Sequence, residues 1–263
     1  MIGQKIAIIG GGNLGRAIAE GLLSGQLIKP ENITVTRRKL QLIDDLKEKG
    51  VKTTSNNPDA VKNATVVIVA VKPRKIIGIL EEIRESLSSD AILISAVTGV
   101  KLSEILEALE NKAVVFRAMP NTAIAIHESM TCVCTVNGSE EKEKIVFSIF
   151  NQLGKTILVD EELMDASTVL AACGIAFALR FIRAAAQGGI EIGFDSHTAH
   201  LIASQTVRGA AGLLIEGTAH PETEIDKVTT PQGYTIAGLN EMEHQGFSSS
   251  LIKGIVTSFN KIN

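Results

Sequence analysis

Lys5-Ile6-Ala7-Ile8-Ile9-Gly10-Gly11-Gly12-Asn13-Leu14-Gly15 is the stretch of sequence that decides the fold of this chain. It joins a short apolar run, of the kind that forms a buried strand, to the pattern G-x-G-x-x-G. A helical pattern follows, from Arg16 to Leu23. Strand, glycine turn and helix in this order predict a βαβ unit whose helix N-terminus faces the pyrophosphate of a dinucleotide. Glycines alone would be weak evidence, but their place between strand and helix makes the pattern specific.

Each glycine of this turn has its own expected role. Gly10 allows the tight turn, Gly12 leaves room for the phosphates, and Gly15 lets the helix lie close to the strand. Asn13 and Leu14 begin the helix, where free N–H groups face the anion. We predict that all five residues bind a cofactor; the alternative is a glycine-rich turn without a ligand.

Strand-like and helix-like segments alternate up to about Asp160. Strands are expected at residues 5–9, 33–36, 51–53, 66–71, 91–95, 114–117, 130–135 and 156–159, and a helix at 140–152. Two of these runs are apolar throughout, which is typical of central strands covered on both faces. The alternation predicts an α/β fold: a doubly wound, mainly parallel sheet of the Rossmann type over residues 1–160.

The pattern changes to all-α from residue 161 to residue 263. Long Ala- and Ile-rich helices are expected at 163–192 and 196–216, followed by a polar loop and two shorter helices. The first is apolar nearly all round, although Arg180 and Arg183 disfavour a membrane span, so it must be buried. A domain this small offers few faces of its own. We therefore predict a dimerisation domain that a second copy covers; the alternative is a monomer that buries the helix between its own domains.

Composition narrows the class of protein. The 263 residues are 45% hydrophobic and carry a formal charge of −3 without a long run of one sign, which disfavours nucleic-acid and membrane partners. Cys132, Cys134 and Cys173 lack metal-ligand spacing and are odd in number, so we expect a reducing, cytoplasmic location. His197 and His200 share a helix face but have no acidic or thiol ligand nearby, so we predict no metal.

The end of the second expected strand indicates which dinucleotide binds. NAD-binding units place an acidic residue there for the ribose 2′-hydroxyl, whereas this chain reads Thr36-Arg37-Arg38-Lys39. Guanidinium groups bind phosphate oxygens in pairs, so Arg37 and Arg38 suit the 2′-phosphate of NADPH. NADH remains possible, because a basic helix start can also be a solvated surface.

Several dinucleotide-dependent enzyme classes are disfavoured by missing residues. The only tyrosine, Tyr234, has Gly238 four residues later, where short-chain reductases need lysine. No lysine lies between Lys155 and Lys227, where β-hydroxyacid dehydrogenases use one. A hydride-transfer enzyme without a strong general base fits an imine substrate, because solvent can protonate the nitrogen of a C=N bond.

Over essentially its whole length, the chain resembles the pyrroline-5-carboxylate reductase family. The resemblance rests on five segments in the family's order: the opening glycine motif, Ala70-Val71-Lys72-Pro73, Arg117-Ala118-Met119-Pro120-Asn121-Thr122, Ala172-Cys173-Gly174-Ile175-Ala176-Phe177, and Val228 to Leu239 with Thr229-Thr230-Pro231-Gln232-Gly233-Tyr234-Thr235 at its centre. It implies NAD(P)H-dependent reduction of Δ1-pyrroline-5-carboxylate to L-proline, the last step of proline biosynthesis, by a homodimer or larger oligomer.

The resemblance also implies residue roles. The cofactor would contact residues that follow strands, where open α/β sheets bind ligands: Asn56, Ala70, Val71, Lys72, Pro73, Met119 and Pro120. The imine acid would contact Asn121, Thr122, Gly174, Thr230, Gly233, Tyr234 and Thr235. Backbone around Gly233 would hold the carboxylate, and Thr235 would donate a hydrogen bond to the imine nitrogen as the catalytic residue. Simple helix capping is the alternative for Thr235.

Four positions depart from the family's pattern. Ala123 stands for proline, Ile175 for proline in the long-helix motif, Gln232 for the first glycine of the signature, and Tyr234 for a small residue. These changes leave two alternatives open: a reductase of a related cyclic imine acid on the same scaffold, or a non-catalytic dinucleotide-sensing protein.

Overall fold

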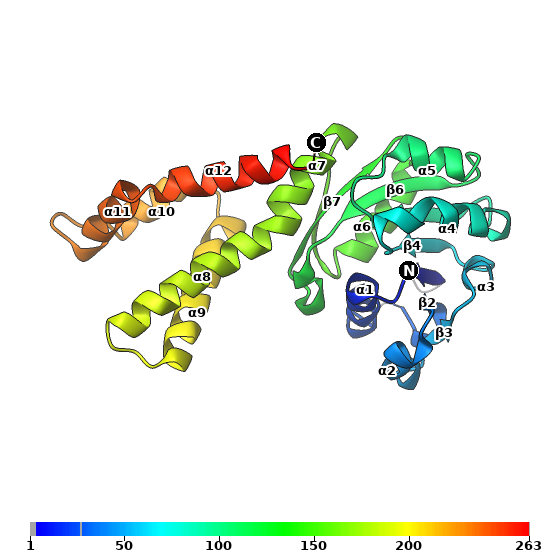
Figure 1. Ribbon diagram of the computed structural model, residues 1–263, viewed down its shortest axis with the longest axis horizontal. Helices are drawn as coiled ribbons and strands as arrows, with labels where there is room; N and C mark the ends of the chain where they lie inside the picture. Colours follow the sequence, from blue (N-terminus) through cyan, green and yellow to red (C-terminus); the bar gives the residue numbers. More distant parts are fainter. Residues whose placement is uncertain (1–3, 27, 263) are drawn as a thin grey trace. The chain divides into compact units, whose positions relative to one another are not determined.

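The computed structural model describes residues 4–26 and 28–262, and it divides into two compact units (Figure 1). The first unit runs to Cys173 and the second begins at Gly174. This division lies beyond the boundary expected near Asp160, because residues 161–173 pack with the first unit. Met164 in this segment is fully buried in a core of the first unit, and Val159 and Ala171 pack partly buried against the same core.

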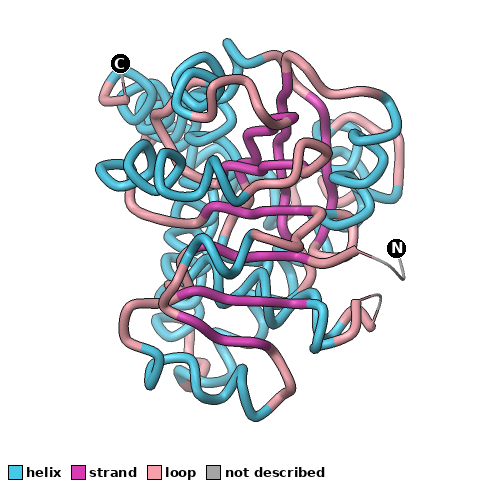
Figure 2. The backbone as a smooth tube through the Cα atoms, turned by 90° about the vertical axis from the view of Figure 1, so that its right-hand side faces the viewer, coloured by secondary structure: helices cyan, strands magenta, loops and turns pink. Residues whose placement is uncertain are grey.

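An eight-stranded sheet forms the centre of the first unit (Figure 2). Its strands are β1 (Ile6–Ile9), β2 (Ile33–Thr36), β3 (Lys52–Thr54), β4 (Val66–Val69), β5 (Ile92–Ser95), β6 (Val114–Met119), β7 (Ser129–Thr135) and β8 (Gly154–Leu158). Their order is β3-β2-β1-β4-β5-β6-β7-β8, and every neighbouring pair is parallel except β6 and β7. The predicted mainly parallel sheet is confirmed.

Helices cover both faces of this sheet. They are α1 (Asn13–Ser24), α2 (Asp44–Glu48), α3 (Asn57–Val61), α4 (Ile76–Ile83), α5 (Leu102–Ala108), α6 (Glu140–Phe150) and α7 (Met164–Ser167), with 3₁₀ turns at Pro30–Asn32, Leu40–Ile43, Pro73–Lys75, Arg84–Ser86, Thr122–Ile126 and Glu161–Leu163. Alternate residues of β1 belong to different cores: Ile6 and Ile8 pack with α1 and α6, whereas Ala7 and Ile9 pack with α3, α4 and α5. This alternation, which follows from the two-residue period of a strand, gives the doubly wound architecture.

A buried ion pair ties β6 to the segment after β8. The Nη1 group of Arg117, whose side chain is 4% exposed, donates to Oε1 of Glu161 at 2.8 Å. The same carboxylate oxygen accepts from the backbone N–H of Leu102 at 2.6 Å, at the start of α5. Glu161 therefore joins three elements of the first unit.

Replacing Glu161 with alanine is expected to lower the free energy of unfolding by about 2–3 kcal/mol, because the Arg117 guanidinium would stay buried without its partner. The expected loss of stability is smaller than for a fully buried ion pair, because Glu161 is partly solvated. Urea denaturation measures the change. Glu162→Ala is the matched control, because Glu162 is exposed beside it; equal losses for the two variants would contradict a role for the ion pair.

The second unit is entirely helical and buries few of its residues. It contains α8 (Gly174–Glu191), α9 (Ser196–Glu216), α10 (Pro221–Lys227), α11 (Tyr234–His244) and α12 (Phe247–Asn260). A π-helical turn, Thr168–Cys173, precedes α8. Among its described residues, the only buried hydrophobic side chains are Ala186, Ala199 and Ala203.

Large apolar side chains of this unit are exposed within the single chain. They include Leu179, Ile192, Leu201, Leu213, Ile215, Ile252 and Val256. The helices of the second unit do not bury these side chains among themselves.

By length and composition alone, the helical stretch Glu161–Glu191 could cross a membrane. This is weak evidence for a membrane span, because the buried core helices of soluble proteins pass the same test.

Candidate functional site

The glycine turn after β1 is built as the sequence predicts. Gly10 has a φ of +104°, and a Cβ atom there would lie 2.5 Å from the carbonyl oxygen of Ala70. A Cβ atom on Gly15 would lie 2.1 Å from the carbonyl oxygen of Gly10, so the helix approaches the turn closely. A Cβ atom on Gly12 would have no neighbour within 4 Å. Gly10 and Gly15 thus shape the turn, while Gly12 faces open space.

The N-terminus of α1 is left free to bind an anion. Gly12 is its N-cap and supplies no capping side chain, and the first turn contains no acidic residue. The turn itself is fixed from β2, because Thr36 accepts from Gly10 N–H through its hydroxyl and from Gly11 N–H through its carbonyl. The first N–H groups of the helix, which include those of Asn13 and Leu14, have no intrahelical acceptor. Such a terminus attracts phosphate.

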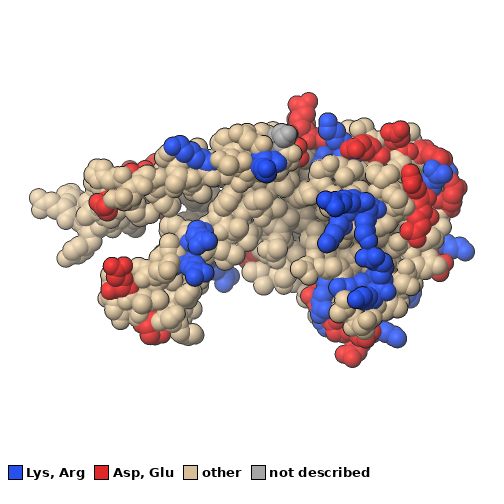
Figure 3. Space-filling view, viewed as in Figure 1, with Lys and Arg blue, Asp and Glu red and all other residues tan. Residues whose placement is uncertain are grey.

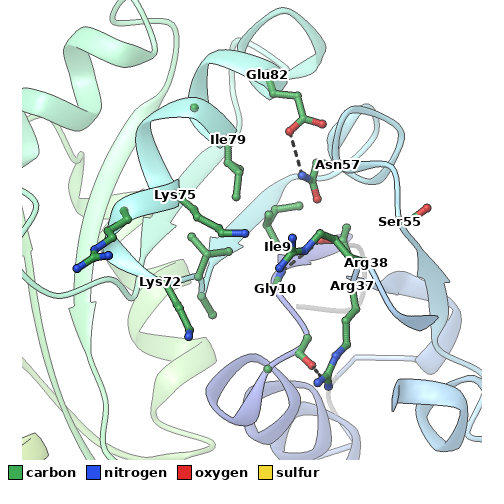
Figure 4. Close-up of a pocket in the computed structure, with 17 residues that line it drawn as sticks. Ile9, Gly10, Arg37, Arg38, Ser55, Asn57, Lys72, Lys75, Ile79 and Glu82 are labelled. Carbon is green, nitrogen blue, oxygen red and sulfur yellow. Dashed lines mark hydrogen bonds between the residues drawn. The ribbon is translucent and has the colours of Figure 1, made fainter. Parts of the chain in front are cut away.

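A cavity of about 630 Å³ lies at the carboxyl ends of β1, β2 and β4 (Figure 4). Its lining includes seven of the residues predicted to bind the cofactor: Gly10, Gly12, Arg37, Arg38, Ala70, Val71 and Lys72. The lining does not include Asn13, Leu14, Gly15, Asn56, Pro73, Met119 or Pro120. The carboxyl ends of parallel strands are where open α/β sheets bind dinucleotides.

The two adjacent arginines have different surroundings. Arg37 donates through Nη1 to the carbonyl oxygen of Gly11 at 2.6 Å and to that of Leu42 at 3.5 Å, so it braces the glycine turn. Arg38 is exposed and has no hydrogen-bond or ion-pair partner within the described residues. Of the pair, Arg38 has its whole guanidinium free for a ligand, whereas Arg37 uses its Nη1 group within the turn.

The cavity also contains residues that the sequence reasoning missed. These are Ile9, Gly11, Thr36, Ser55, Asn57, Arg74, Lys75, Gly78, Ile79 and Glu82. Asn57 donates through Nδ2 to Glu82 Oε2 at 3.1 Å. Its neighbour Asn56, the residue expected here, instead caps α3 by accepting from the N–H of Asp59. Ser55, Asn57, Arg74 and Lys75 could have been found from their positions in the segments that follow β3 and β4.

Charge in the cavity is strongly unbalanced. Five of its lining residues are basic and one, Glu82, is acidic. Lysine and arginine side chains gather on this face of the first unit in Figure 3. A basic cavity beside a free helix N-terminus favours a ligand with several phosphate charges.

The loop after β6 uses its polar groups in the fold. Asn121 is 7% exposed; its Oδ1 accepts from Ala123 N–H, and its Nδ2 donates to the carbonyl oxygen of Ala171 at 3.2 Å. Its backbone N–H donates to Ser129 Oγ. Thr122 beside it is exposed. The Asn121 side chain therefore holds the loop against the π-helical turn, and Thr122 is the member of the predicted pair that a ligand can reach.

The predicted substrate segment forms the start of α11 in the second unit. Gly233 is the N-cap; its N–H donates to the carbonyl oxygen of Thr230 at 2.9 Å, and no side chain caps the helix. Tyr234, fully exposed, and Thr235 occupy the first turn. Thr235 is thus not the capping residue of this helix. Gly174, also predicted, is the first residue of α8.

Gln232, where the family has glycine, adopts a left-handed backbone with φ +59°. This conformation costs a residue with a Cβ atom about 1–2 kcal/mol more than glycine, partly offset by the greater freedom of glycine in the unfolded chain. Gln232→Gly is therefore expected to raise the free energy of unfolding by about 0.5–1 kcal/mol. Thermal denaturation measures it, with Gln245→Gly, at a helix C-cap with φ −82°, as the control that should not stabilise.

Neither a cluster of metal ligands nor an ionised Cys134 thiol is found in the described part of the chain. No group of three or more His, Cys, Asp or Glu residues is placed to hold a metal ion there. Burial raises the pKa of the Cys134 thiol to about 11, which keeps it protonated at neutral pH. The arrangement instead offers two separate helix N-termini and a basic cavity.

Comparison with known proteins gives two family matches, one in each half of the chain. Residues 161–263 match the model for pyrroline-5-carboxylate reductase dimerisation, and residues 5–99 match that for NADP oxidoreductase coenzyme F420-dependent. The second match covers the glycine turn and every residue of the cavity lining.

Individual relatives match nearly the whole chain. "Pyrroline-5-carboxylate reductase 1" of Dictyostelium discoideum is 48% identical over 97% of this chain, although the chain spans only 49% of that protein's length. "Pyrroline-5-carboxylate reductase 2" of the same organism is 44% identical, over 98% of this chain and 92% of that protein. The solved structure of a pyrroline-5-carboxylate reductase from Coxiella burnetii is 30% identical, with a TM-score of 0.91 over 98% of this chain and 97% of that one.

Proposed function

Because the chain belongs to the pyrroline-5-carboxylate reductase family, we propose that it reduces Δ1-pyrroline-5-carboxylate to L-proline with NADPH, in the last step of proline biosynthesis. The single observation that carries this proposal is the basic cavity beside the glycine turn, which suits a dinucleotide with an additional phosphate. Proline and its imine precursor differ by one hydride and one proton across a C=N bond.

The residues of the cavity fit the cofactor. Gly12 leaves open space at the N-terminus of α1 for the pyrophosphate, and Ala70 and Val71 line the far side of the turn. When bound, the nicotinamide supplies the hydride for the imine carbon. The chain positions the two reactants. No strong general base is needed, because the imine nitrogen is already protonated.

The substrate binds, in this proposal, at the N-terminus of α11. The free N–H groups that follow Gly233 hold the carboxylate, and the Thr235 hydroxyl donates to the imine nitrogen. Two observations support this reading: Thr235 is exposed, and it is not used to cap its helix. A hydroxyl at the nitrogen fixes the orientation of the ring, and solvent supplies the proton that the nitrogen gains.

The chain forms a homo-oligomer, as its match to the dimerisation family supports. We propose further that the interface is a dimer built from α8 to α12. The support is the large set of exposed apolar side chains on these helices, which a monomer would leave in water. Neither a nucleic acid nor a membrane is part of the proposal, since the basic residues gather in a cavity rather than along a surface stripe.

A related cyclic imine acid is the second candidate substrate. Tyr234 is fully exposed at the proposed carboxylate site, and Gln232 is held in a conformation that favours glycine. Both residues differ from the family's small ones, so the pocket accepts a ring of different size or substitution.

The reaction is tested by following the loss of nicotinamide absorbance with NADPH, and separately with NADH, in the presence of pyrroline-5-carboxylate. We expect turnover with NADPH preferred, and Thr235→Val should lose most of kcat while Thr235→Ser retains it. Turnover only with a six-membered cyclic imine acid would favour the second candidate. Folded protein that binds NADPH but reduces no imine would contradict the proposed function and favour a dinucleotide sensor.

A cytoplasmic location is proposed as well. Its support is chemical: Cys132, Cys134 and Cys173 are all free thiols, as a reducing compartment maintains them. Fractionation of cells with a cytoplasmic marker tests it, and co-purification with organelles would contradict it.

A further inference from the structure

The basic residues of the cavity lack partners of opposite charge. Its single acid, Glu82, already accepts a hydrogen bond from Asn57. Arg38 and Lys75 are exposed, and neither takes part in an ion pair within residues 4–26 and 28–262. Unpaired cations that line a cavity, rather than an open surface, indicate a site for an anion.

Two of these cations approach from opposite walls. Arg38 follows β2, and Lys75 ends the 3₁₀ turn after β4. The strand order places β2 and β4 on either side of β1, so the two side chains flank the glycine turn. Figure 4 shows them extending toward one another across the cavity. Two like charges that face each other repel, and an anion between them converts that repulsion into attraction to both.

The position of the pair decides which phosphate would lie there. The pyrophosphate belongs at the N-terminus of α1, next to Gly12, whereas the adenosine ribose lies beyond the end of β2. Arg38 lies just after the end of β2, where the adenosine ribose is expected. The phosphate that reaches it is therefore the one on the ribose 2′-oxygen, which distinguishes NADPH from NADH.

We propose that Arg38 and Lys75 clamp the 2′-phosphate of NADPH from two sides, and that Lys75 is a specificity-determining residue of this enzyme. Arg37 is then a positioning residue, because its Nη1 group donates to the carbonyl oxygens of Gly11 and Leu42. These roles rest on one part of the proposed function, namely that the protein binds NADPH.

Calorimetric titration of the full chain with 2′,5′-ADP and with 5′-AMP tests the clamp directly. These two nucleotides differ only in the 2′-phosphate, and neither requires turnover. Lys75→Gln and Arg38→Gln should each weaken 2′,5′-ADP binding about tenfold, the effect of one lost charge-assisted hydrogen bond, and change 5′-AMP binding less than about twofold. Lys75→Arg should keep the preference, since it keeps the charge.

Two further variants separate the roles. Lys155→Gln, on the edge strand β8 far along the sheet from β2, should change neither affinity. Arg37→Gln should weaken both nucleotides together, because it loosens the turn. An unchanged ratio of the two affinities in Lys75→Gln would overturn the clamp, as would equal binding of the two nucleotides by the unaltered chain. Failure of the reductase assay alone would leave these affinities unaffected, so the two proposals are separately testable.

Discussion

Gly12→Asp is expected to lower the affinity for NADPH about 100-fold or more while leaving the fold intact. An aspartate there places a carboxylate where the pyrophosphate binds, and like charges a few ångströms apart repel by several kcal/mol in a partly buried site. The protein itself tolerates the change, because a Cβ atom on Gly12 has no neighbour within 4 Å and φ is −79°. Aspartate is also a better N-cap than glycine, so α1 is not weakened.

Fluorescence titration of NADPH and thermal denaturation, measured on the same sample, check this prediction. Gly15→Ala is the matched contrast. Its Cβ atom would lie 2.1 Å from the Gly10 carbonyl oxygen, so it should cost about 1–3 kcal/mol of stability. NADPH binding by Gly12→Asp equal to that of the unaltered chain would contradict the assignment of this helix N-terminus to the pyrophosphate.

Ile252→Glu is expected to convert the oligomer into single chains. Ile252 lies on α12 with 60% of its surface exposed in the single chain, beside other exposed apolar side chains of the same helix. Burying a carboxylate in an apolar interface costs several kcal/mol unless it finds a partner. Since the second unit buries little beyond three alanines, the separated chain should also lose helical structure at a lower temperature.

Light scattering after size exclusion measures the mass, and circular dichroism follows the helices. Lys253→Glu, on the same helix at a position that is already charged and exposed, is the control that should keep the oligomer. Leu213→Glu on α9 repeats the test on a second helix. If both apolar-to-glutamate variants keep the mass of the unaltered protein, the interface does not use these helices.

The strands and the glycine turn could be predicted because their signals are local. The apolar runs 66–71 and 91–95 are typical of central strands, and the spacing of Gly10, Gly12 and Gly15 is typical of a turn that binds a dinucleotide. The dimerisation domain could also be predicted, because an apolar helix in so small a domain favours cover by a second copy, and residues 161–263 match the dimerisation family.

The side-chain roles could not be predicted in the same way. Arg37 and Arg38 are adjacent in the sequence, and only the fold shows that the first reaches Gly11 and Leu42 while the second stays free. Asn121 has the residue type of a ligand-binding group, but its partner is the carbonyl of Ala171, 50 residues away. Lys75 belongs to the connection between β4 and β5, whereas Arg38 belongs to the connection between β2 and β3. Contacts between distant segments depend on register and packing, which local patterns do not encode.

Isotope transfer tests the central claim most directly. NADPH carrying deuterium at the transferring position of the nicotinamide is incubated with the enzyme and pyrroline-5-carboxylate, and the product is analysed by mass spectrometry. The account predicts L-proline with a single deuterium on the former imine carbon. NADPH that stays bound and unreacted, with no labelled proline formed, would contradict it.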